Sequence, residues 1–216
     1  MGAPAFNNHA VNNPDVNDDV TFHQRLLNAM GYDAGPIDGV RGPMTAKAAA
    51  AFARDADALQ DAFGARDDRS ERNIRTLHIA AQERVRGFLT ALDAASFPFA
   101  VRIISGARSY AAQNRLYAKG RNGDPDPKVT NARGGQSRHN FAIAWDIGLF
   151  EDGRYLTGAT QVETRAYRRV AEIVDLKGLE WGGDWSRFVD LPHYQLDTGN
   201  SLSETRALFE MGRAYV

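Results

Sequence analysis

The sequence predicts an α+β protein in which a small helical module precedes a larger domain built from helices and strands. Apolar residues recur at helical spacing in several stretches, whereas two other stretches show the alternation or the β-branched residues typical of strands. With 216 residues, 43% of them hydrophobic, the chain can hold one domain of ordinary size and a small module. We expect four regions in order: a flexible leader over 1–19, the helical module over 20–62, a linker over 63–72 and the main domain over 73–216.

Charge and composition exclude several classes of partner. The chain has 26 Lys and Arg against 27 Asp and Glu, a net charge of −1, so no broad basic field would draw it to nucleic acid or anionic lipid. The absence of cysteine removes disulfides, thiolate nucleophiles and cysteine-type zinc sites. No apolar run approaches the roughly 20 residues of a membrane span, and the first residues lack the basic and apolar regions of a signal peptide. We expect no nucleic-acid partner, no membrane insertion and a monomer.

The module begins with a short predicted helix. Its apolar residues at helical spacing are Phe22, Leu26, Leu27 and Met30. Gly31 suits the C-terminal cap of this helix. A glycine-rich loop follows over 35–43, and then an alanine-rich helix over 44–58 that should bury Ala48 and Phe52.

A long amphipathic helix is predicted from residue 73 onward, because its apolar residues stand three or four apart. They are Ile74, Leu77, Ala81, Val85, Phe88 and Leu92. His78 lies one step off this stripe and is interpreted as a surface or packing histidine. The charge-dense residues before the helix favour a linker or a solvated helix face.

The rest of the main domain alternates between strands, helices and one long loop. The β-branched run 99–104 predicts a strand, and 111–118 a helix. Residues 120–135 contain several Gly and Pro and predict an irregular loop of the length that is often functional. A closing helix is expected over 202–215, with Met211 among its core-facing residues.

The stretch 137–146 carries the clearest chemistry. His139 and Asp146 stand seven residues apart, and both are ligands that zinc accepts in a catalytic site. Residues 141–149 alternate large apolar side chains with small or charged ones, which predicts a half-buried strand with Asp146 on the face of small residues. That face leaves space for an ion. His139 and Asp146 are an odd number of residues apart, so a strand that continued through both would place them on opposite faces. We therefore infer a turn over 138–140 that swings the imidazole toward Asp146.

A third ligand candidate, His193, follows Asp190 by three residues. Pro192 biases the residue before it toward an extended or polyproline conformation, which has three residues per turn and would let Asp190 and His193 face the same way. Other interpretations stay open for each residue alone. Asp190 and Asp146 could be turn residues, and His139 a capping or packing histidine. Arg108 alone could be a surface arginine, although its permanent charge can hold a carboxylate or a developing oxyanion.

The module resembles a known family. Gly31 and Tyr32, the G-x-I-D-G-x-x-G-P-x-T loop over 35–45, and A-x-x-x-F from Ala48 to Phe52 are similar to the peptidoglycan-binding domain of cell-wall hydrolases. The resemblance covers about residues 20–60. It implies binding to bacterial peptidoglycan through Tyr32, Asp38 and Arg41. The alternative is a plain helical hairpin, which also needs glycines in its turn.

Three motifs of the main domain also occur in one family, in the same order. They are S-G-x-R-S-x-x-x-Q from Ser105, S-x-H-x-x-x-x-A-x-D from Ser137, and W-G-G-D-W from Trp181 followed by D-x-P-H from Asp190. They resemble zinc peptidases that cut peptidoglycan stem peptides: the D-Ala-D-Ala carboxypeptidase and L-alanyl-D-glutamate endopeptidase family, including phage endolysins. The resemblance spans about residues 73–200 and implies an α+β domain with a central antiparallel sheet. Ala142 stands where the family usually has glycine, which should narrow the small-residue face.

The same resemblance assigns the site residues. It implies that His139, Asp146 and His193 bind Zn²⁺, that Asp190 is the general base, and that Arg108 assists the substrate or the transition state. Zinc with three protein ligands and an open position activates water near neutral pH and polarises a carbonyl. Further candidates for substrate contact are Ser137, Trp181 and Trp185. Ser137 could equally cap the entry to the strand, and the tryptophans could pack near the site.

The sequence therefore predicts a zinc-dependent peptidoglycan peptidase, with L-alanyl-D-glutamate endopeptidase as the preferred activity. The alternatives are a D-Ala-D-Ala carboxypeptidase and a wall-binding protein without activity. A binding module without a signal peptide is typical of a phage endolysin that is made in the host cytoplasm and reaches the cell wall when a membrane pore opens. An unrecognised export route would leave the same pattern.

Overall fold

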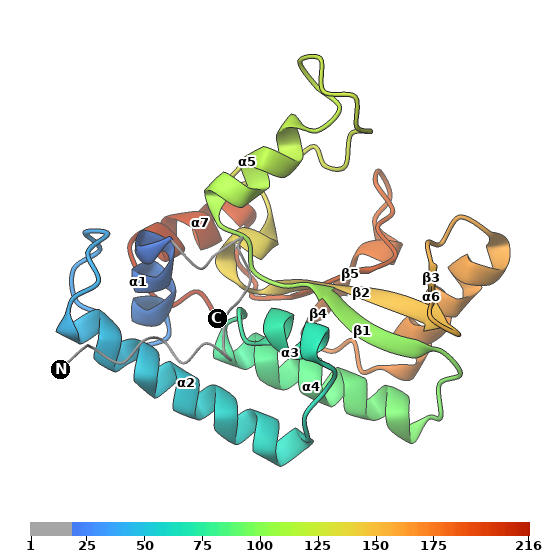
Figure 1. The fold of residues 1–216 in the computed structure, drawn as a ribbon, viewed down its shortest axis with the longest axis horizontal. Helices are drawn as coiled ribbons and strands as arrows, with labels where there is room; N and C mark the ends of the chain where they lie inside the picture. Colours follow the sequence, from blue (N-terminus) through green and yellow to red (C-terminus); the bar gives the residue numbers. More distant parts are fainter. Residues whose placement is uncertain (1–18) are drawn as a thin grey trace.

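A computed structural model describes residues 19–216, so the leader predicted over 1–19 lies outside the described residues except for Asp19. The elements follow one another along the chain as helices and strands of an α+β fold (Figure 1), which confirms the predicted class. They are α1 (Val20–Ala29), α2 (Pro43–Phe63), α3 (Asp68–Ile74), α4 (Ile79–Ala94), β1 (Ala100–Ser105), α5 (Tyr110–Ala118), η1 (Arg138–Phe141), β2 (Ala144–Glu151), β3 (Arg154–Leu156), α6 (Gln161–Ile173), β4 (Leu179–Trp181), η2 (Gly182–Asp184), β5 (His193–Leu196) and α7 (Leu202–Glu210). Among the described residues, no helix combines the length and the apolar character needed to span a membrane.

An antiparallel sheet forms the centre of the main domain, as predicted. Its strands run in the order β1-β2-β5-β4, and β3 pairs with β2 at one end. β2 lies between β1 and β5, and its register with β5 sets Asp146 opposite His193 and Trp145 opposite Tyr194. Because side chains alternate between the faces of a strand, the two pairs project to opposite faces of the sheet.

One face of the sheet packs on α4, which runs below it in Figure 1. Phe88 of α4 contacts the ring of Tyr194 edge-on at 4.8 Å between centroids, and Trp145 at 6.3 Å. The other face carries Asp146 and His193. The alternation of large and small residues along 141–149 is therefore present, but both kinds are buried: Ile147 and Ala144 are each 0% exposed. The strand is covered on both faces rather than half-buried.

The long helix predicted from residue 73 is two helices in the structure. α3 ends at Ile74, and His78 caps α4, its Nδ1 accepting from Ala80 N at 3.2 Å. His78 is thus the packing histidine that the sequence allowed. The apolar stripe itself is correct, because all its members are buried: Ile74, Leu77, Ala81, Val85, Phe88 and Leu92.

The predicted linker over 63–72 contains most of α3. This helix is fastened to β1: Ile103 N donates to Ser70 Oγ at 2.9 Å, and Asn73 Nδ2 donates to Ile103 O at 2.8 Å. Ser70 is 0% exposed. The charged residues give 63–72 the composition of a linker, but two polar side chains on the inner face of α3, Ser70 and Asn73, bind the sheet.

The closing helix is shorter than predicted. α7 starts with a capping box between Ser201 and Glu204 and ends at Glu210. Met211, expected to face the core, is 54% exposed, so that prediction is wrong. Phe209 takes the core position and is 0% exposed. The helix ends before Met211, and the helical spacing used for the prediction no longer applies there.

The N-terminal module has the predicted helix, loop and helix, with α2 longer than expected. Gly31 follows α1 with φ +83°, the left-handed backbone that favours glycine there. Ala48 is 1% exposed as predicted, but Phe52 is only half-buried, against the ring of Tyr32 at 5.9 Å.

This module also shares its core with the main domain. Phe22 of α1 belongs to the same apolar cluster as the sheet, and its ring lies 5.6 Å from that of Phe209 in α7. α2 lies alongside α4 (Figure 1) and contacts it. Where the domain boundary runs stays a prediction, but α1 and α2 cover surface that the main domain would otherwise expose to water.

We therefore expect Phe22→Ala to destabilise the whole chain. Truncating a buried phenylalanine costs about 3–5 kcal/mol of unfolding free energy, and here both parts of the molecule line the resulting cavity. Thermal or urea unfolding should show one transition at lower temperature or denaturant. Val40→Ala, at a side chain 64% exposed in the same module, is the control and should change little. Two separate transitions, with only the first one shifted, would contradict the shared core.

Candidate metal centre

Three predicted ligands, from three different elements, meet on the face of the sheet opposite α4. His139 comes from η1, Asp146 from β2 and His193 from β5, and their ligand atoms all lie within 4.8 Å of one another. Asp146 Oδ1 is 3.2 Å from His139 Nε2 and 3.1 Å from His193 Nδ1. Tetrahedral zinc with bonds of about 2.0–2.1 Å sets its ligand atoms about 3.3–3.4 Å apart. The distances from Asp146 Oδ1 to the two ring nitrogens therefore suit a small tetrahedral ion.

The turn inferred from the parity of His139 is confirmed. Residues 138–141 form a single turn of 3₁₀ helix, and Ala142 then takes a left-handed conformation with φ +56° that leads into β2. The family preference for glycine at this position has a backbone reason, since an L-residue is strained there. The methyl group of Ala142 packs in the main apolar cluster, so the expected narrowing of the small-residue face is not its role.

Each imidazole offers one defined nitrogen to the cluster. His139 Nδ1 lies 2.7 Å from the carbonyl oxygen of Gly106, which can only accept, so Nδ1 carries the proton and Nε2 is left as a lone pair. His193 Nε2 lies 3.0 Å from Gln195 Oε1 and donates to it, which leaves Nδ1 as a lone pair. Two lone pairs and a carboxylate oxygen thus point at one another. With both rings neutral, this arrangement is favourable only when a cation lies among the three atoms, either a metal ion or a proton on His193 Nδ1. The donor set therefore fits a metal ion.

The electrostatics agree with such a site. Burial lowers the pKa of His139 to about 4, helped by the positive charge of Arg108, so its imidazole is neutral, as a ligand must be. Burial raises the pKa of Asp146, but the histidines and Arg108 outweigh it and hold this pKa well below the usual range. Burial also lowers the pKa of His193, but hydrogen bonding to Asp146 and the charge of that carboxylate outweigh it, so this pKa is raised. The space between Asp146 and His193 attracts positive charge.

Arg108 holds the second oxygen of the Asp146 carboxylate. Its Nη2 donates to Asp146 Oδ2 at 2.7 Å and to Ser105 Oγ at 2.7 Å, and its backbone N–H donates to His139 O at 2.9 Å. The guanidinium therefore orients the Asp146 carboxylate. Its predicted contact with substrate or transition state stays a prediction.

Asp190 lies beside the cluster in a tight turn. The N–H of His193 donates to Asp190 O at 3.1 Å, so the segment is a hydrogen-bonded turn and the expected polyproline conformation is wrong. Burial raises the pKa of Asp190, and the negative charge of Asp146 raises it further. A carboxyl group with a raised pKa is better matched to proton transfer in neutral solution.

Two residues of the W-G-G-D-W motif build the support for that turn. Gly182 O accepts from Asp190 N at 2.9 Å, and a Cβ at Gly182 would lie 2.5 Å from Asp190 O and 3.1 Å from His193 Cβ. Trp181 Nε1 donates to Leu191 O at 2.9 Å, and the residue is 6% exposed. Trp181 has the packing role that was one of its two interpretations.

We expect Gly182→Ala to damage the site more than the fold. The added methyl group would displace the Asp190 turn, and overpacking of this kind costs about 1–3 kcal/mol. Turnover should fall about 10- to 100-fold, because an ångström of misplacement has this effect on catalysis. Gly42→Ala is the matched control, since no atom lies within 4 Å of a Cβ there and φ is −93°. Unchanged kinetics for Gly182→Ala would contradict the supporting role.

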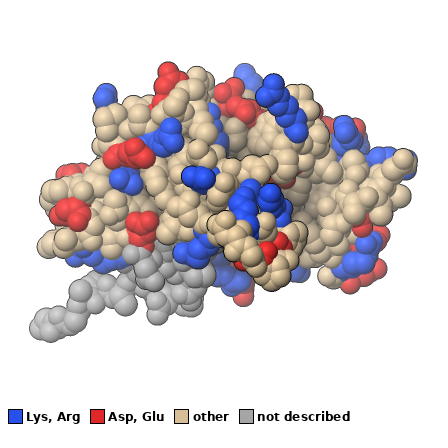
Figure 2. Space-filling model, turned by 90° about the horizontal axis from the view of Figure 1, so that it is seen from above, with Lys and Arg blue, Asp and Glu red and all other residues tan. Residues whose placement is uncertain are grey.

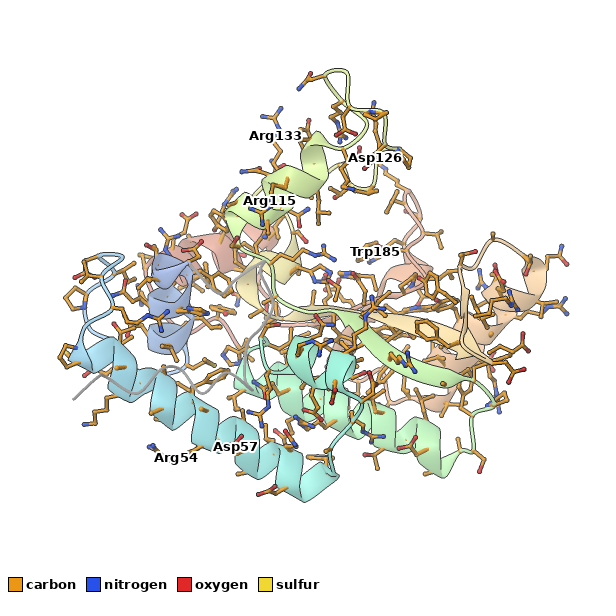
Figure 3. The ribbon with its side chains drawn as sticks, viewed as in Figure 1. Arg54, Asp57, Arg115, Asp126, Arg133 and Trp185 are labelled. Carbon is orange, nitrogen blue, oxygen red and sulfur yellow. The ribbon has the colours of Figure 1, made fainter. Side chains whose placement is uncertain are left out.

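Trp185 and Ser137 remain candidates for substrate contact. The ring of Trp185 is half-buried and lies 5.0 Å from the ring of His193. In Figure 3 it lies on the same side of the sheet as α5 and the loop that carries Asp126. Ser137 is half-buried at the start of η1, and its side chain makes no cap hydrogen bond there. Acidic and basic side chains are interspersed over the face shown in Figure 2, in line with the net charge of −1.

The residues predicted to touch the cell wall have structural partners as well. Asp38 accepts from Gln24 Nε2 at 2.9 Å and from Val40 N at 2.8 Å, which shapes the glycine-rich loop. Tyr32 donates to Asp55 at 2.5 Å. Arg41 is exposed on the same loop. Wall contact by these residues stays a prediction.

Sequence reasoning missed the groups that hold the two imidazoles. Gly106 acts through its carbonyl, which no side-chain pattern reveals. Gln195 could have been found, because it stands two residues after His193 and therefore shares its face of a strand. Its second partner, Glu180 Oε2 at 2.7 Å from Gln195 Nε2, depends on the pairing of β4 with β5.

Comparison with known proteins points to peptidases. Residues 130–196 match a family model described as D-alanyl-D-alanine carboxypeptidase. Over 101 residues the chain is 40% identical to the peptidoglycan L-alanyl-D-glutamate endopeptidase CwlK of Bacillus subtilis (strain 168), in an alignment that covers 44% of this chain and 60% of that protein. A crystal structure of the Serratia marcescens L-Ala D-Glu endopeptidase ChiX aligns with 59% of this chain and 86% of its own, at 25% identity and a TM-score of 0.38.

The chain thus spans about 60% of the length of this curated relative. The matched segment 130–196 contains all three residues of the metal centre and Asp190. The segment that carries the site is therefore similar to peptidases of the D-alanyl-D-alanine carboxypeptidase family.

Proposed function

We propose that this protein is a zinc-dependent peptidoglycan peptidase that hydrolyses the L-alanyl-D-glutamate bond of the stem peptide. The observation that carries the proposal is the cluster of His139, Asp146 and His193, in which Asp146 Oδ1 lies 3.2 Å from His139 Nε2 and 3.1 Å from His193 Nδ1. Two histidines and one carboxylate, with a further position open, form a donor set of catalytic zinc sites. The similarity to an L-alanyl-D-glutamate endopeptidase supports the choice of bond.

The residues of the chain divide the chemistry between them. When bound, zinc would supply a Lewis acid and make water nucleophilic near neutral pH. Asp190 takes a proton from the attacking water and delivers it to the leaving amine, the role for which its raised pKa suits it. Arg108 keeps the Asp146 carboxylate in orientation through Oδ2. Trp185 forms one wall beside His193, against which part of the stem peptide packs.

A second candidate is a D-Ala-D-Ala carboxypeptidase acting at the same site. The description of the family model that matches residues 130–196 favours it. Both reactions hydrolyse an amide next to a D-amino acid, so the same cluster would serve. They differ in product, because one releases a new amino-terminal D-glutamate and the other a free D-alanine.

The proposal extends to the setting in which the enzyme works. We propose that residues 20–62 bind the bacterial cell wall and that the protein acts there as a monomeric endolysin, after release from the cytoplasm of a phage host. The glycine-rich loop pattern and the exposed Arg41 on that loop support wall binding. The resemblance of the main-domain motifs to a family that includes phage endolysins supports the endolysin role.

Mass spectrometry of purified peptidoglycan tests the activity directly. Sacculi are incubated with the protein, with and without a zinc chelator, and the soluble products are identified. We expect chelator-sensitive fragments with amino-terminal D-glutamate. Loss of terminal D-alanine instead would select the carboxypeptidase. Sacculi that bind the protein but stay chemically unchanged would leave only a wall-binding function.

A further inference from the structure

A hydrogen-bonded chain of side chains extends from the metal centre across the sheet. His193 Nε2 lies 3.0 Å from Gln195 Oε1, and Gln195 Nε2 lies 2.7 Å from Glu180 Oε2. The sheet register explains the alignment: His193 and Gln195 are alternate residues of β5, and Gln195 stands opposite Glu180 of β4. His193 and Gln195 are 6% and 5% exposed, so water does not compete freely for these bonds.

The direction of this chain is set at its outer end. The carboxylate of Glu180 can only accept hydrogen bonds, so the amide group of Gln195 must turn its NH₂ toward Glu180. The amide oxygen of Gln195 then faces His193, and Nε2 of His193 must carry the proton. Nδ1 is left as the lone pair, 3.1 Å from Asp146 Oδ1.

We propose that Glu180 and Gln195 are positioning residues that set the tautomer of His193 and so make its Nδ1 the metal-binding atom. The inference rests on the proposed zinc site. Neither residue touches the ion or the substrate. Together they act as the Gly106 carbonyl does for His139, where the main chain holds Nδ1–H at 2.7 Å.

The hydrogen-bond partners of the two imidazoles differ in how readily they can be changed by mutation. The Gly106 carbonyl is built into the fold, because a Cβ at Gly106 would lie 2.4 Å from Asn73 O and 2.4 Å from Thr76 Oγ1. The holder of His193 consists of two side chains, and the outer one is only half-buried. The tautomer of His193 can therefore be altered by one isosteric substitution at a side chain that does not touch the ion.

Glu180→Gln is the substitution that tests the proposal. The amide it introduces can donate as well as accept, so the Gln195 amide is free to turn its NH₂ toward His193. That orientation favours the proton on Nδ1 and blocks the metal-binding atom. We expect zinc affinity to fall about 10- to 100-fold, as is usual when the outer partner of a ligand is lost, with the fold retained.

A paired exchange should restore the lost affinity. In E180Q/Q195E the amide introduced at position 180 donates to the carboxylate introduced at position 195, whose other oxygen accepts from His193 Nε2. The single change Q195E should be worse than E180Q, because two carboxylates would then face each other at the 2.7 Å contact. Glu172→Gln, which removes an exposed carboxylate on α6 that pairs with Arg169, is the control for charge.

Two measurements decide the result without any assay of catalysis. Zinc affinity is measured by competition with a chromophoric chelator, and the tautomer of His193 by ¹⁵N NMR of the metal-free protein above the pKa of that histidine. Weaker zinc binding and a shift of the proton to Nδ1 in Glu180→Gln, both reversed in E180Q/Q195E, would support the positioning role of Glu180 and Gln195. Unchanged zinc affinity and tautomer in Glu180→Gln would overturn it. If the parent chain binds no zinc, the proposed function fails. The NMR measurement of the His193 tautomer still tests the positioning role of Glu180 and Gln195 in that case.

Discussion

Asp190→Ala should lower the turnover of soluble stem peptides about 10²- to 10⁴-fold while zinc stays bound at full stoichiometry. This is the range that a positioned general acid–base group contributes. Asp190 lies outside the ligand cluster of His139, Asp146 and His193, so its removal takes away no metal contact. Burial and the charge of Asp146 raise its pKa, as a proton carrier near neutral pH requires.

Two further variants make this result specific. Asp190→Asn keeps the shape and should be as inactive as the alanine variant, because an amide cannot take up the proton. Asp184→Ala removes an exposed carboxylate from the same segment and should leave turnover unchanged. Full turnover in Asp190→Ala would remove Asp190 as the base, and loss of zinc would make it a ligand instead.

Replacing either histidine of the cluster should abolish both metal binding and turnover. With His139→Ala or His193→Ala, the ion keeps only two protein ligands. The Lewis acid contributes several kcal/mol to the transition state, and about 1.4 kcal/mol corresponds to a factor of ten, so turnover should fall about 10³-fold or more. Zinc content after dialysis and hydrolysis of a stem peptide are the two readouts.

The matched control is a histidine outside the cluster. His78 is buried and caps α4 through Nδ1, and asparagine can replace it as a cap. His78→Asn should therefore keep its zinc and its turnover. A His139→Ala protein that retains stoichiometric zinc would show that the cluster is not the binding site.

The chemistry of the centre was readable from local patterns. The parity of a strand is a property of consecutive residues, so the sequence predicted that Asp146 lies among small side chains and that a turn must bring His139 over to it. The ligand types of His139, Asp146 and His193 indicated a metal site, and the resemblance of short motifs then assigned the role of general base to Asp190. The glycine after α1 follows likewise from local backbone geometry, with φ +83° at Gly31.

Other features depend on residues far apart in the chain, and local patterns missed them. Phe22 joins the main core through its contact with Phe209, and α3 is tied to β1 through Ser70. Composition alone cannot distinguish these two arrangements from a separate module followed by a plain linker. The turn at Asp190 is supported by Gly182 O, which accepts from Asp190 N. The sequence prediction for this segment used only the nearby Pro192, which carries no information about that distant carbonyl.

The sequence by itself therefore determined which three side chains meet in the cluster, because residue type and the period of a strand are local. Only the tertiary structure decided how those residues are held. The choice of Nδ1 in His193 depends on Gln195 and Glu180, and that of Nε2 in His139 on the Gly106 carbonyl. Such partners are set by strand pairing and close backbone approach, and these arise only when distant parts of the chain pack together.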